Sequence, residues 1–320
     1  MNSKPEYDFV LPIRRELKAF GAVLQNKGYK SDTIRQKCNY TGLYLVWLES
    51  ERMSPDQVRY NDVLAFVDHL RLSGKSARCV NTILLAVRHY YQWLKETLRA
   101  TVNPALNLHL RGVRRKVPAG ILSYETLEKL YAQYAVTDLR TARNRVILGL
   151  IVYQGLTCGE LHRLTTHHIK LKEGKIQVPG DSRSRHRVLE LKSFQVIELH
   201  EYMTQVRPAI ISQADTPKPN GRIARKTRIQ EAYRLFTSVN GSGNLKNSLH
   251  HLFGYLKKVN PDVKNPGQIR QSVIVHWLKS HNLRQVQYMA GHRWVSSTER
   301  YRLDNLEGLQ AELDKYHPLG

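Results

Sequence analysis

The first third of the chain has the apolar spacing of amphipathic helices. Apolar residues recur three and four positions apart in segments that short polar stretches separate, namely 9–24, 40–48, 61–70 and 80–98. This spacing predicts helices that each bury one face. Asp32 and Thr33 are expected to cap the second helix, and the Asn103-Pro104 step ends the block. The pattern therefore predicts a helical bundle over residues 1–110.

The next segment, residues 111–120, is basic and has no apolar periodicity. Such a composition predicts a linker between two domains. Its basic residues can also follow a phosphate backbone, an interpretation that competes on equal terms with a solvated hinge. These residues are Arg111, Arg114, Arg115 and Lys116.

Residues 121–320 combine helical segments with one β-hairpin. Apolar and polar residues alternate over 175–179 and again over 187–191, on either side of a polar turn at 180–184. Period-two alternation around a turn predicts paired antiparallel strands. The apolar run 146–153 is shorter than the roughly 18 residues that span a bilayer, so it predicts a buried helix. Further helices are expected over 123–134, 195–206, 245–259, 268–280, 284–290 and 305–316.

These patterns together predict a mainly α fold with two domains. The linker would join the N-terminal helical bundle to an α+β domain, residues 121–320, that carries a small antiparallel sheet. A basic loop is expected at 213–228, where Pro, Gly, Lys and Arg are frequent.

The charge balance narrows the class of function. The 320 residues include 50 Lys and Arg against 27 Asp and Glu, a formal charge of +23. A field of this sign favours a polyanion, most often nucleic acid, and a generally basic protein is the competing interpretation. The N-terminus lacks an apolar signal core, and the three cysteines are far apart. These features argue against secretion, a disulfide framework and a zinc site, so we expect a cytoplasmic protein without membrane segments.

Several short motifs follow one another in the second half of the chain. Gly291-His292 precedes Tyr301, which lies nine residues beyond the histidine and after a Ser-Thr step. Residues 266–270 read PGQIR, and residues 153–161 read YQGLTCGEL, shortly before the hairpin. In order and spacing, these motifs resemble those of the tyrosine recombinase (phage integrase-type) family. The N-terminal bundle and the basic linker resemble the core-binding domain of that family and its connection to the catalytic domain.

The resemblance implies site-specific DNA recombination or integration through a covalent 3′-phosphotyrosyl intermediate, for a mobile element. Tyr301 would be the nucleophile. Arg270 would hold the scissile phosphate and stabilise its developing charge, and His292 would contact the phosphate and handle a proton. The resemblance implies neither a cofactor nor a metal. The implied partner is double-stranded DNA of the nucleoid. The resemblance implies that a homo-oligomer, a tetramer, binds this DNA, either alone or together with a partner recombinase.

Three family positions lack the expected residue in this chain. The first-box arginine falls on Thr157, a histidine falls on Gly267, and the hairpin lysine falls near Ser182 or Arg183, in a turn without lysine. Loss of one phosphate-clamping donor typically lowers a rate by about 10²–10³-fold. Arg183 and Arg185 in the hairpin are the first candidates to compensate, although a guanidinium is a poor proton donor. Weaker candidates are Arg143 and Arg145.

These departures leave two other functions open. One is a catalytically weakened protein of the recombinase fold, which binds DNA architecturally or assists an active partner recombinase. The other is an unrelated basic protein that binds RNA or DNA. A covalent adduct between Tyr301 and DNA would distinguish site-specific recombination from both of these alternatives.

Other basic residues are candidates for duplex contacts, with a solvated charged face as the competing interpretation. Besides the linker, they are Lys75, Arg78 and Arg187, and on the helices Arg35, Lys37 and Arg88. The segment 305–316 carries an apolar stripe at Leu306, Leu309 and Leu313. In the family a C-terminal helix commonly docks on a neighbouring protomer, and packing on its own domain is the alternative.

Overall fold

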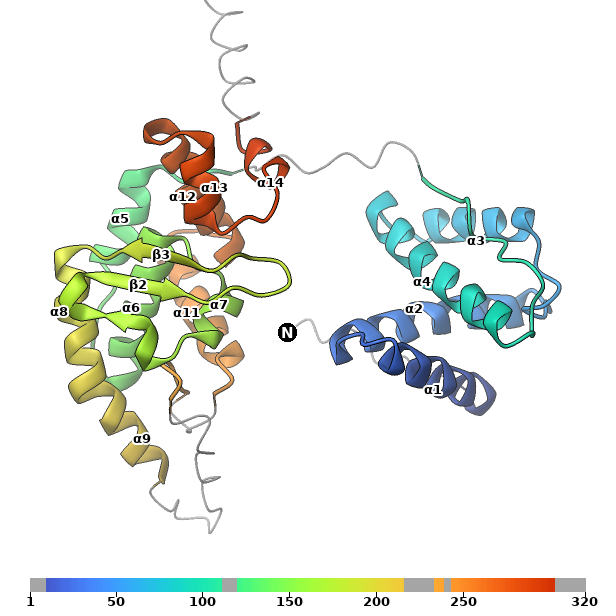
Figure 1. Ribbon diagram of the computed structural model, residues 1–320, viewed down its shortest axis with the longest axis horizontal. Helices are drawn as coiled ribbons and strands as arrows, with labels where there is room; N and C mark the ends of the chain where they lie inside the picture. The colour runs from blue at the N-terminus through green and yellow to red at the C-terminus, as the bar shows by residue number, and fades with distance from the viewer. Residues whose placement is uncertain (1–9, 111–119, 216–232, 239–242, 303–320) are drawn as a thin grey trace, which may run out of the picture. The chain divides into compact units, whose positions relative to one another are not determined.

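The computed structural model describes residues 10–110, 120–215, 233–238 and 243–302. The chain separates into two compact units, residues 1–115 and 116–320, each with its own hydrophobic core (Figure 1). Residues 111–119, most of the expected basic loop and the expected C-terminal helix at 305–316 lie outside the described residues.

The described part of the N-terminal unit is a helical bundle. Its helices are α1 (Leu11–Asn26), α2 (Ser31–Ser50), α3 (Tyr60–Leu72) and α4 (Ala77–Glu96). α2 packs on both α1 and α4, because each helix gathers its apolar residues on one face. These faces meet in an aromatic core in which Phe20, Tyr44 and Phe66 are almost completely buried. The bundle predicted from the apolar spacing is therefore confirmed.

The start of the second helix differs from the expectation. Lys30 occupies the N-cap position of α2, so Asp32 lies in the first turn and pairs with Arg35 at 2.7 Å. The predicted cap at Asp32 and Thr33 is therefore wrong: the chain becomes helical before it reaches them. Ser76 caps α4, since its side chain accepts a hydrogen bond from the amide of Cys79.

Two basic residues that were candidates for duplex contacts serve the bundle instead. Arg88 donates hydrogen bonds to the carbonyl oxygens of Ala105 and Leu108, at 3.1 and 2.8 Å, and thereby holds the chain after α4 against that helix. Lys37 is buried, and its Nζ lies 3.1 Å from Nδ1 of His89. Both cations therefore have partners within their own unit.

The C-terminal unit is built around α6 (Leu139–Gln154), the helix predicted from the apolar run. Its Ile147, Leu148 and Ile151 are completely buried, and it packs on α5, α8, α11 and α12. Gly155 ends the helix in the left-handed conformation, with φ of 57°. The other helices are α5 (Tyr124–Ala132), α7 (Cys158–Arg163), α8 (Ser193–Glu201), α9 (Arg207–Asp215), α11 (Lys246–Val259), α12 (Pro266–Ser280), α13 (Leu283–Ala290) and α14 (Ser296–Glu299). Shorter helical segments are the 3-10 helices η1 (Thr166–His168) and η2 (Leu171–Glu173) and the π-helix η3 (Tyr202–Val206), which joins α8 to α9.

A three-stranded antiparallel sheet accompanies these helices. Its strands are β1 (Ile169–Lys170), β2 (Lys175–Val178) and β3 (Arg187–Glu190), in the order β1-β2-β3. Ile176 pairs with Leu189, and both side chains are buried, because alternate residues of a strand face the same side. The loop between β2 and β3 extends beyond the sheet in Figure 1. The predicted mainly α fold with one small antiparallel sheet is confirmed. Among the described residues no helix is long and apolar enough to cross a membrane.

Candidate active site

Arg270 lies in the second turn of α12 and is fixed by backbone carbonyls. Pro266 begins the helix, and the Asn265 side chain caps it by accepting a hydrogen bond from the Gln268 amide at 3.0 Å. The Arg270 guanidinium donates to the carbonyl oxygens of Gly155 and Ala290. Its side chain is only 12% exposed. A guanidinium held in this way keeps its direction before any ligand arrives.

His292 follows the end of α13. Gly291 adopts φ of 67°, a left-handed conformation that reverses the chain and is natural for glycine. Nδ1 of His292 lies 2.9 Å from Oγ1 of the buried Thr298. Thr298 therefore fixes the orientation of the imidazole and leaves Nε2 as its other polar atom.

Tyr301 packs against this histidine. The two rings are stacked almost parallel, with an interplanar angle of 8° and centroids 6.0 Å apart. The tyrosine is 3% exposed and packs in an apolar cluster that includes Ile274 and Val286. Arg300 donates a hydrogen bond from Nη2 to the Tyr301 Oη at 2.8 Å, and its guanidinium lies 4.8 Å from the ring centroid. A cation therefore lies directly at the phenol oxygen.

A buried carboxylate, Glu160, connects the site to α7. Its Oε1 lies 2.6 Å from Nη1 of Arg187, and its Oε2 lies 3.7 Å from Nη1 of Arg270. The Oε2 atom also accepts hydrogen bonds from the amide and hydroxyl of Thr157, at 2.8 and 2.9 Å. Burial would raise the pKa of Glu160, but Arg187 and Arg270 outweigh burial and hold it below its ordinary value. The carboxylate is therefore ionised between two guanidinium groups.

The charges of these groups reach one another. Burial, together with the positive charges of Arg270, Arg300 and Arg187, lowers the pKa of His292 to about 4. The imidazole is therefore neutral at pH 7. Burial also lowers the pKa of Arg270, and the Glu160 carboxylate opposes that shift.

The hairpin turn lies against the same segment. Ser184 forms a β-bridge with His292, and the Arg185 amide donates to the Gly291 carbonyl at 2.9 Å. Asp181 shapes the turn, because its Oδ1 accepts hydrogen bonds from the amides of Arg183 and Ser184 at 2.6 and 2.8 Å. These bonds, together with the positive charge of Arg163, lower the pKa of Asp181 to about 2.

The structure distributes the predicted site residues unevenly. It brings Arg270, His292 and Tyr301 together, with Thr157 at the edge of the same cluster. Ser182, Arg183 and Arg185 are exposed on the turn beside His292. Gly267 lies in the first turn of α12. The weaker candidates have other partners: Arg143 donates to the Thr237 carbonyl at 2.8 Å, and Arg145 pairs with Glu198 at 2.9 Å.

The candidates for duplex contacts also divide. Lys75 and Arg78 are exposed near the start of α4. Arg187 is completely buried, so it is not one of the cations exposed on the protein surface. The alternation of inward and outward residues along β3 places Arg187 on the inward face. This signal was missed because a charged residue is expected on the surface. The linker candidates Arg111, Arg114, Arg115 and Lys116 lie outside the described residues.

Three residues of the cluster had no role assigned from sequence. Glu160 belongs to the YQGLTCGEL stretch, so its position in that motif was the available signal. Thr298 and Arg300 shortly precede Tyr301 in the chain, but spacing alone does not show that Thr298 meets the imidazole and Arg300 the phenol oxygen.

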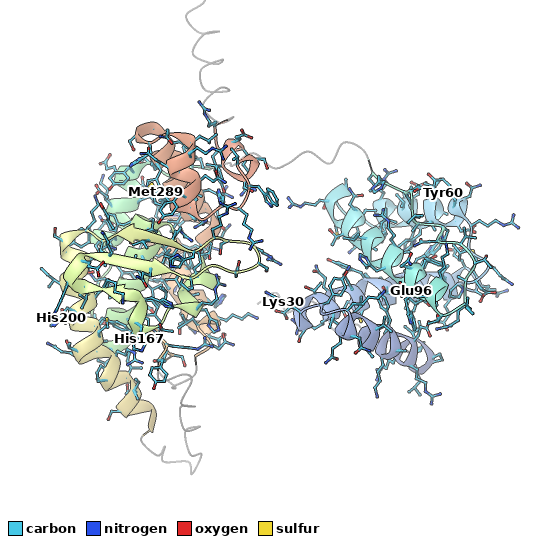
Figure 2. All side chains as sticks on the ribbon, in the orientation of Figure 1. Lys30, Tyr60, Glu96, His167, His200 and Met289 are labelled. Carbon is cyan, nitrogen blue, oxygen red and sulfur yellow. The ribbon has the colours of Figure 1, made fainter. Side chains whose placement is uncertain are left out.

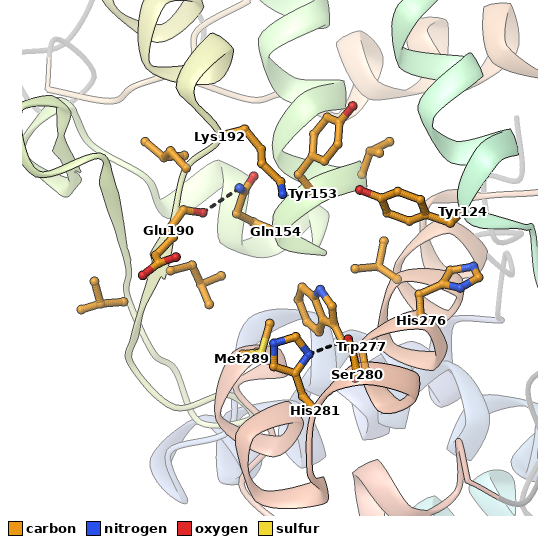
Figure 3. Close-up of a pocket in the computed structure, with 15 residues that line it drawn as sticks. Tyr124, Tyr153, Gln154, Glu190, Lys192, His276, Trp277, Ser280, His281 and Met289 are labelled. Atoms are coloured by element: carbon orange, nitrogen blue, oxygen red, sulfur yellow. Dashed lines mark hydrogen bonds between the residues drawn. The ribbon is translucent and has the colours of Figure 1, made fainter.

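A separate pocket of about 710 Å³ lies between β3, α6 and the second half of α12 (Figure 3). Trp277 and Gln154 line it, together with Met289 of α13, which is labelled in Figures 2 and 3. Gln154 donates to the Glu190 carbonyl at 2.9 Å in this pocket. Arg270, His292 and Tyr301 do not line it.

Comparison with known proteins assigns both units to known domain types. Residues 121–307 match the phage integrase family, and residues 14–97 match the phage integrase N-terminal SAM-like domain. A curated relative, tyrosine recombinase XerD of Chlorobaculum tepidum, is 23% identical over 97% of this chain and 98% of its own. Tyrosine recombinase XerD of Oceanobacillus iheyensis is 27% identical over 82% of this chain and 84% of its own.

Two solved structures have the same fold. XerH site-specific recombinase, bound to a palindromic DNA substrate after cleavage, gives a TM-score of 0.64 at 17% identity and covers 97% of this chain and 98% of its own. The Tn1549 transposon integrase with a circular intermediate DNA gives 0.61 at 16% identity, over 89% of this chain and 94% of its own. The family match covers more than half of the chain and includes the residues that converge on Tyr301. The chain therefore belongs to the phage integrase family.

Proposed function

We propose that this protein cleaves and rejoins double-stranded DNA in site-specific recombination, with Tyr301 as the nucleophile. The observation that carries the proposal is the convergence of Tyr301, His292 and Arg270 beside the ionised Glu160. The recombinases among its relatives support the same class of reaction. Recombination for a mobile element is the specific role that we propose.

The proposed reaction needs only protein groups. The Tyr301 Oη attacks the scissile phosphorus and its phenolic proton leaves to a base, while the bond to the 5′-oxygen breaks and that oxygen leaves as a hydroxyl after taking up a proton. The 3′-phosphate stays on the tyrosine. The phosphodiester bond energy is therefore kept, and attack by a 5′-hydroxyl rejoins the strand without nucleotide or metal.

Each residue has a role that its surroundings support. Arg270, held by two carbonyls, stabilises the charge that develops on a non-bridging oxygen. His292 is neutral at pH 7 because its pKa is lowered to about 4, so it can accept the phenolic proton. Arg300 donates a hydrogen bond to the phenol oxygen and places a positive charge beside it.

We propose duplex contacts for the N-terminal unit through Lys75 and Arg78, for the linker, and for the exposed turn with Arg183 and Arg185. Exposed cations gain affinity for a duplex by releasing its condensed counterions. Strand exchange joins two duplexes, so we propose a homo-oligomer on DNA.

A second function is favoured by a specific observation. Thr157 lies where the family resemblance places an arginine, and its amide and hydroxyl are used to cap α7 together with Glu160. A site that lacks this cation would bind DNA but cleave it poorly. The alternative is therefore a weakened recombinase that binds DNA architecturally or assists an active partner recombinase.

A trapping experiment distinguishes the two functions. The full-length protein is incubated with nicked duplexes whose central sequence is randomised, so that a cleaved fragment dissociates and the covalent intermediate accumulates. We expect an adduct that survives denaturing electrophoresis for wild type and for the control Tyr288→Phe, and none for Tyr301→Phe. DNA retention in native gels without any adduct would instead establish the architectural function.

A further inference from the structure

A buried cation lies next to the position that Thr157 leaves neutral. Arg187 is the first residue of β3, and its guanidinium is completely buried with Nη1 2.6 Å from Glu160 Oε1. The same carboxylate holds Thr157 through its other oxygen. Arg187 and Thr157 therefore meet at one carboxylate, although 30 residues separate them in the chain.

Two donors of Arg187 are unused. Nε and Nη2 are both buried and have no hydrogen-bond partner among the described residues. Buried unsatisfied donors are unfavourable, and a native structure keeps few of them without a reason. A phosphate oxygen can accept both donors at once, because the guanidinium presents them as a planar fork.

The shared carboxylate leaves a positive charge in the site. Arg187 and Arg270 bring two positive charges to Glu160, which carries one negative charge. The three groups therefore sum to a net charge of +1 in a poorly solvated place, where a charge acts strongly on an incoming anion. The pKa of His292 responds to both guanidinium groups, which shows that Arg187 lies within the electrostatic range of the site.

Gly291 packs against Arg187 and leaves room for its guanidinium. A Cβ on Gly291 would lie 2.4 Å from Arg187 Nη1, so a side chain at that position would collide with the guanidinium. Gly291 immediately precedes His292 in the chain. The turn that positions the histidine thus leaves the space that the arginine occupies.

We propose that Arg187 replaces the missing cation at Thr157 and donates from Nε and Nη2 to a non-bridging oxygen of the scissile phosphate. The inference rests on the proposed function, since it names a second phosphate-binding arginine in that site. The phosphate-binding cation would then come from the start of β3 instead of the start of α7.

The two central variants of the test both lack the Glu160 carboxylate, so neither leaves that carboxylate unpaired. Arg187→Gln alone leaves the buried Glu160 carboxylate without its nearest cation, so this variant risks misfolding. The informative pair is therefore Glu160→Gln and Glu160→Gln/Arg187→Gln, assayed on a nicked duplex recovered from the trapping selection. Arg187→Lys tests whether the charge alone suffices, and Arg145→Gln, which breaks an ion pair elsewhere in the unit, is the matched control.

We expect the double variant to cleave about 10²–10³-fold more slowly than Glu160→Gln, while native gels show similar DNA binding. Arg187→Lys should lose about tenfold, because lysine keeps the charge without the fork, and Arg145→Gln should cleave as wild type does. Cleavage by the double variant within threefold of Glu160→Gln would overturn the proposal and leave Arg187 with the role of neutralising Glu160.

A second measurement does not depend on cleavage. The melting temperatures of the full-length Glu160→Gln and double variants are compared with and without orthovanadate, an anion that mimics the phosphate. We expect orthovanadate to raise the melting temperature of Glu160→Gln but not that of the double variant. Equal shifts, or no shift in either protein, would contradict the proposal even if wild type forms no adduct and the proposed function itself fails.

Discussion

The two units bury different kinds of polar group. In the N-terminal core, the hydroxyls of Tyr44 and Tyr91 meet at 2.7 Å, and both residues are completely buried. In the C-terminal unit, Arg187 and Glu160 meet at 2.6 Å and are equally buried, but both are ionised. Desolvating a hydroxyl pair costs little, whereas desolvating two ions costs several kcal/mol each. A fold gains little stability from such a pair, so the ionic cluster points to chemistry and the hydroxyl pair to packing.

The largest effect should come from breaking the ionic cluster. Glu160→Ala leaves two buried guanidinium groups without their shared carboxylate. We expect a loss of about 3–5 kcal/mol in the unfolding free energy of the C-terminal unit. Hydrogen exchange of α6 and α12 amides measures that unit separately from the bundle. A loss below 1 kcal/mol would show that the cluster is already well solvated.

The pH dependence of the unfolding free energy should show the contribution of His292 to the stability of its unit. Its pKa is about 4 in the folded protein against 6.5 ordinarily. The unfolded chain therefore binds more protons between these values, and the contribution of His292 is lost as pH falls from about 6.5 to 4. We expect this loss to be smaller in His292→Gln, as measured by urea unfolding at each pH. Identical pH profiles would contradict the burial of the imidazole.

Breaking the hydroxyl pair between Tyr44 and Tyr91 should destabilise the bundle less than Glu160→Ala destabilises the C-terminal unit. Tyr44→Phe removes one hydroxyl and leaves the aromatic packing in place. We expect a loss of about 1 kcal/mol, seen as faster exchange of α2 and α4 amides with no change in α12. A loss as large as that of Glu160→Ala would remove the contrast between the two cores.

The smallest effect on cleavage should come from restoring an arginine. Thr157→Arg adds a cation but removes the cap of α7, which costs about 1 kcal/mol of stability. Because Arg187 already supplies a charge, we expect the cleavage rate on a nicked duplex to change by less than threefold. An increase above tenfold would show that the wild-type site lacks a phosphate-binding cation.

The sequence predicted regular structure well because its signals are local. Apolar periodicity predicted the bundle and the buried second half of α6, and it located the hairpin strands, expected over 175–179 and 187–191, to within one residue. Motif spacing selected Arg270, His292 and Tyr301, which the fold brings together. The cap of α2 was missed, since Asp32 is as favourable in a first helical turn as at a cap.

Side-chain direction in the site could not be predicted in this way. Arg187 was grouped with surface cations because arginine is rarely buried without a partner, and its partner Glu160 lies 27 residues earlier in the chain. The pairing of Arg300 with the Tyr301 hydroxyl depends on the rotamers of adjacent residues. Such contacts follow from tertiary packing, which no local pattern encodes.

The most direct test of the proposed chemistry identifies the atom that carries the DNA. Wild-type protein is trapped on nicked duplexes, the DNA is digested to a short remnant, and the peptides are sequenced by mass spectrometry. We expect the nucleotide remnant on Tyr301, joined through a 3′-phosphate. A remnant on another residue, or a site-bound protein that carries none, would contradict the assignment of Tyr301 as the nucleophile.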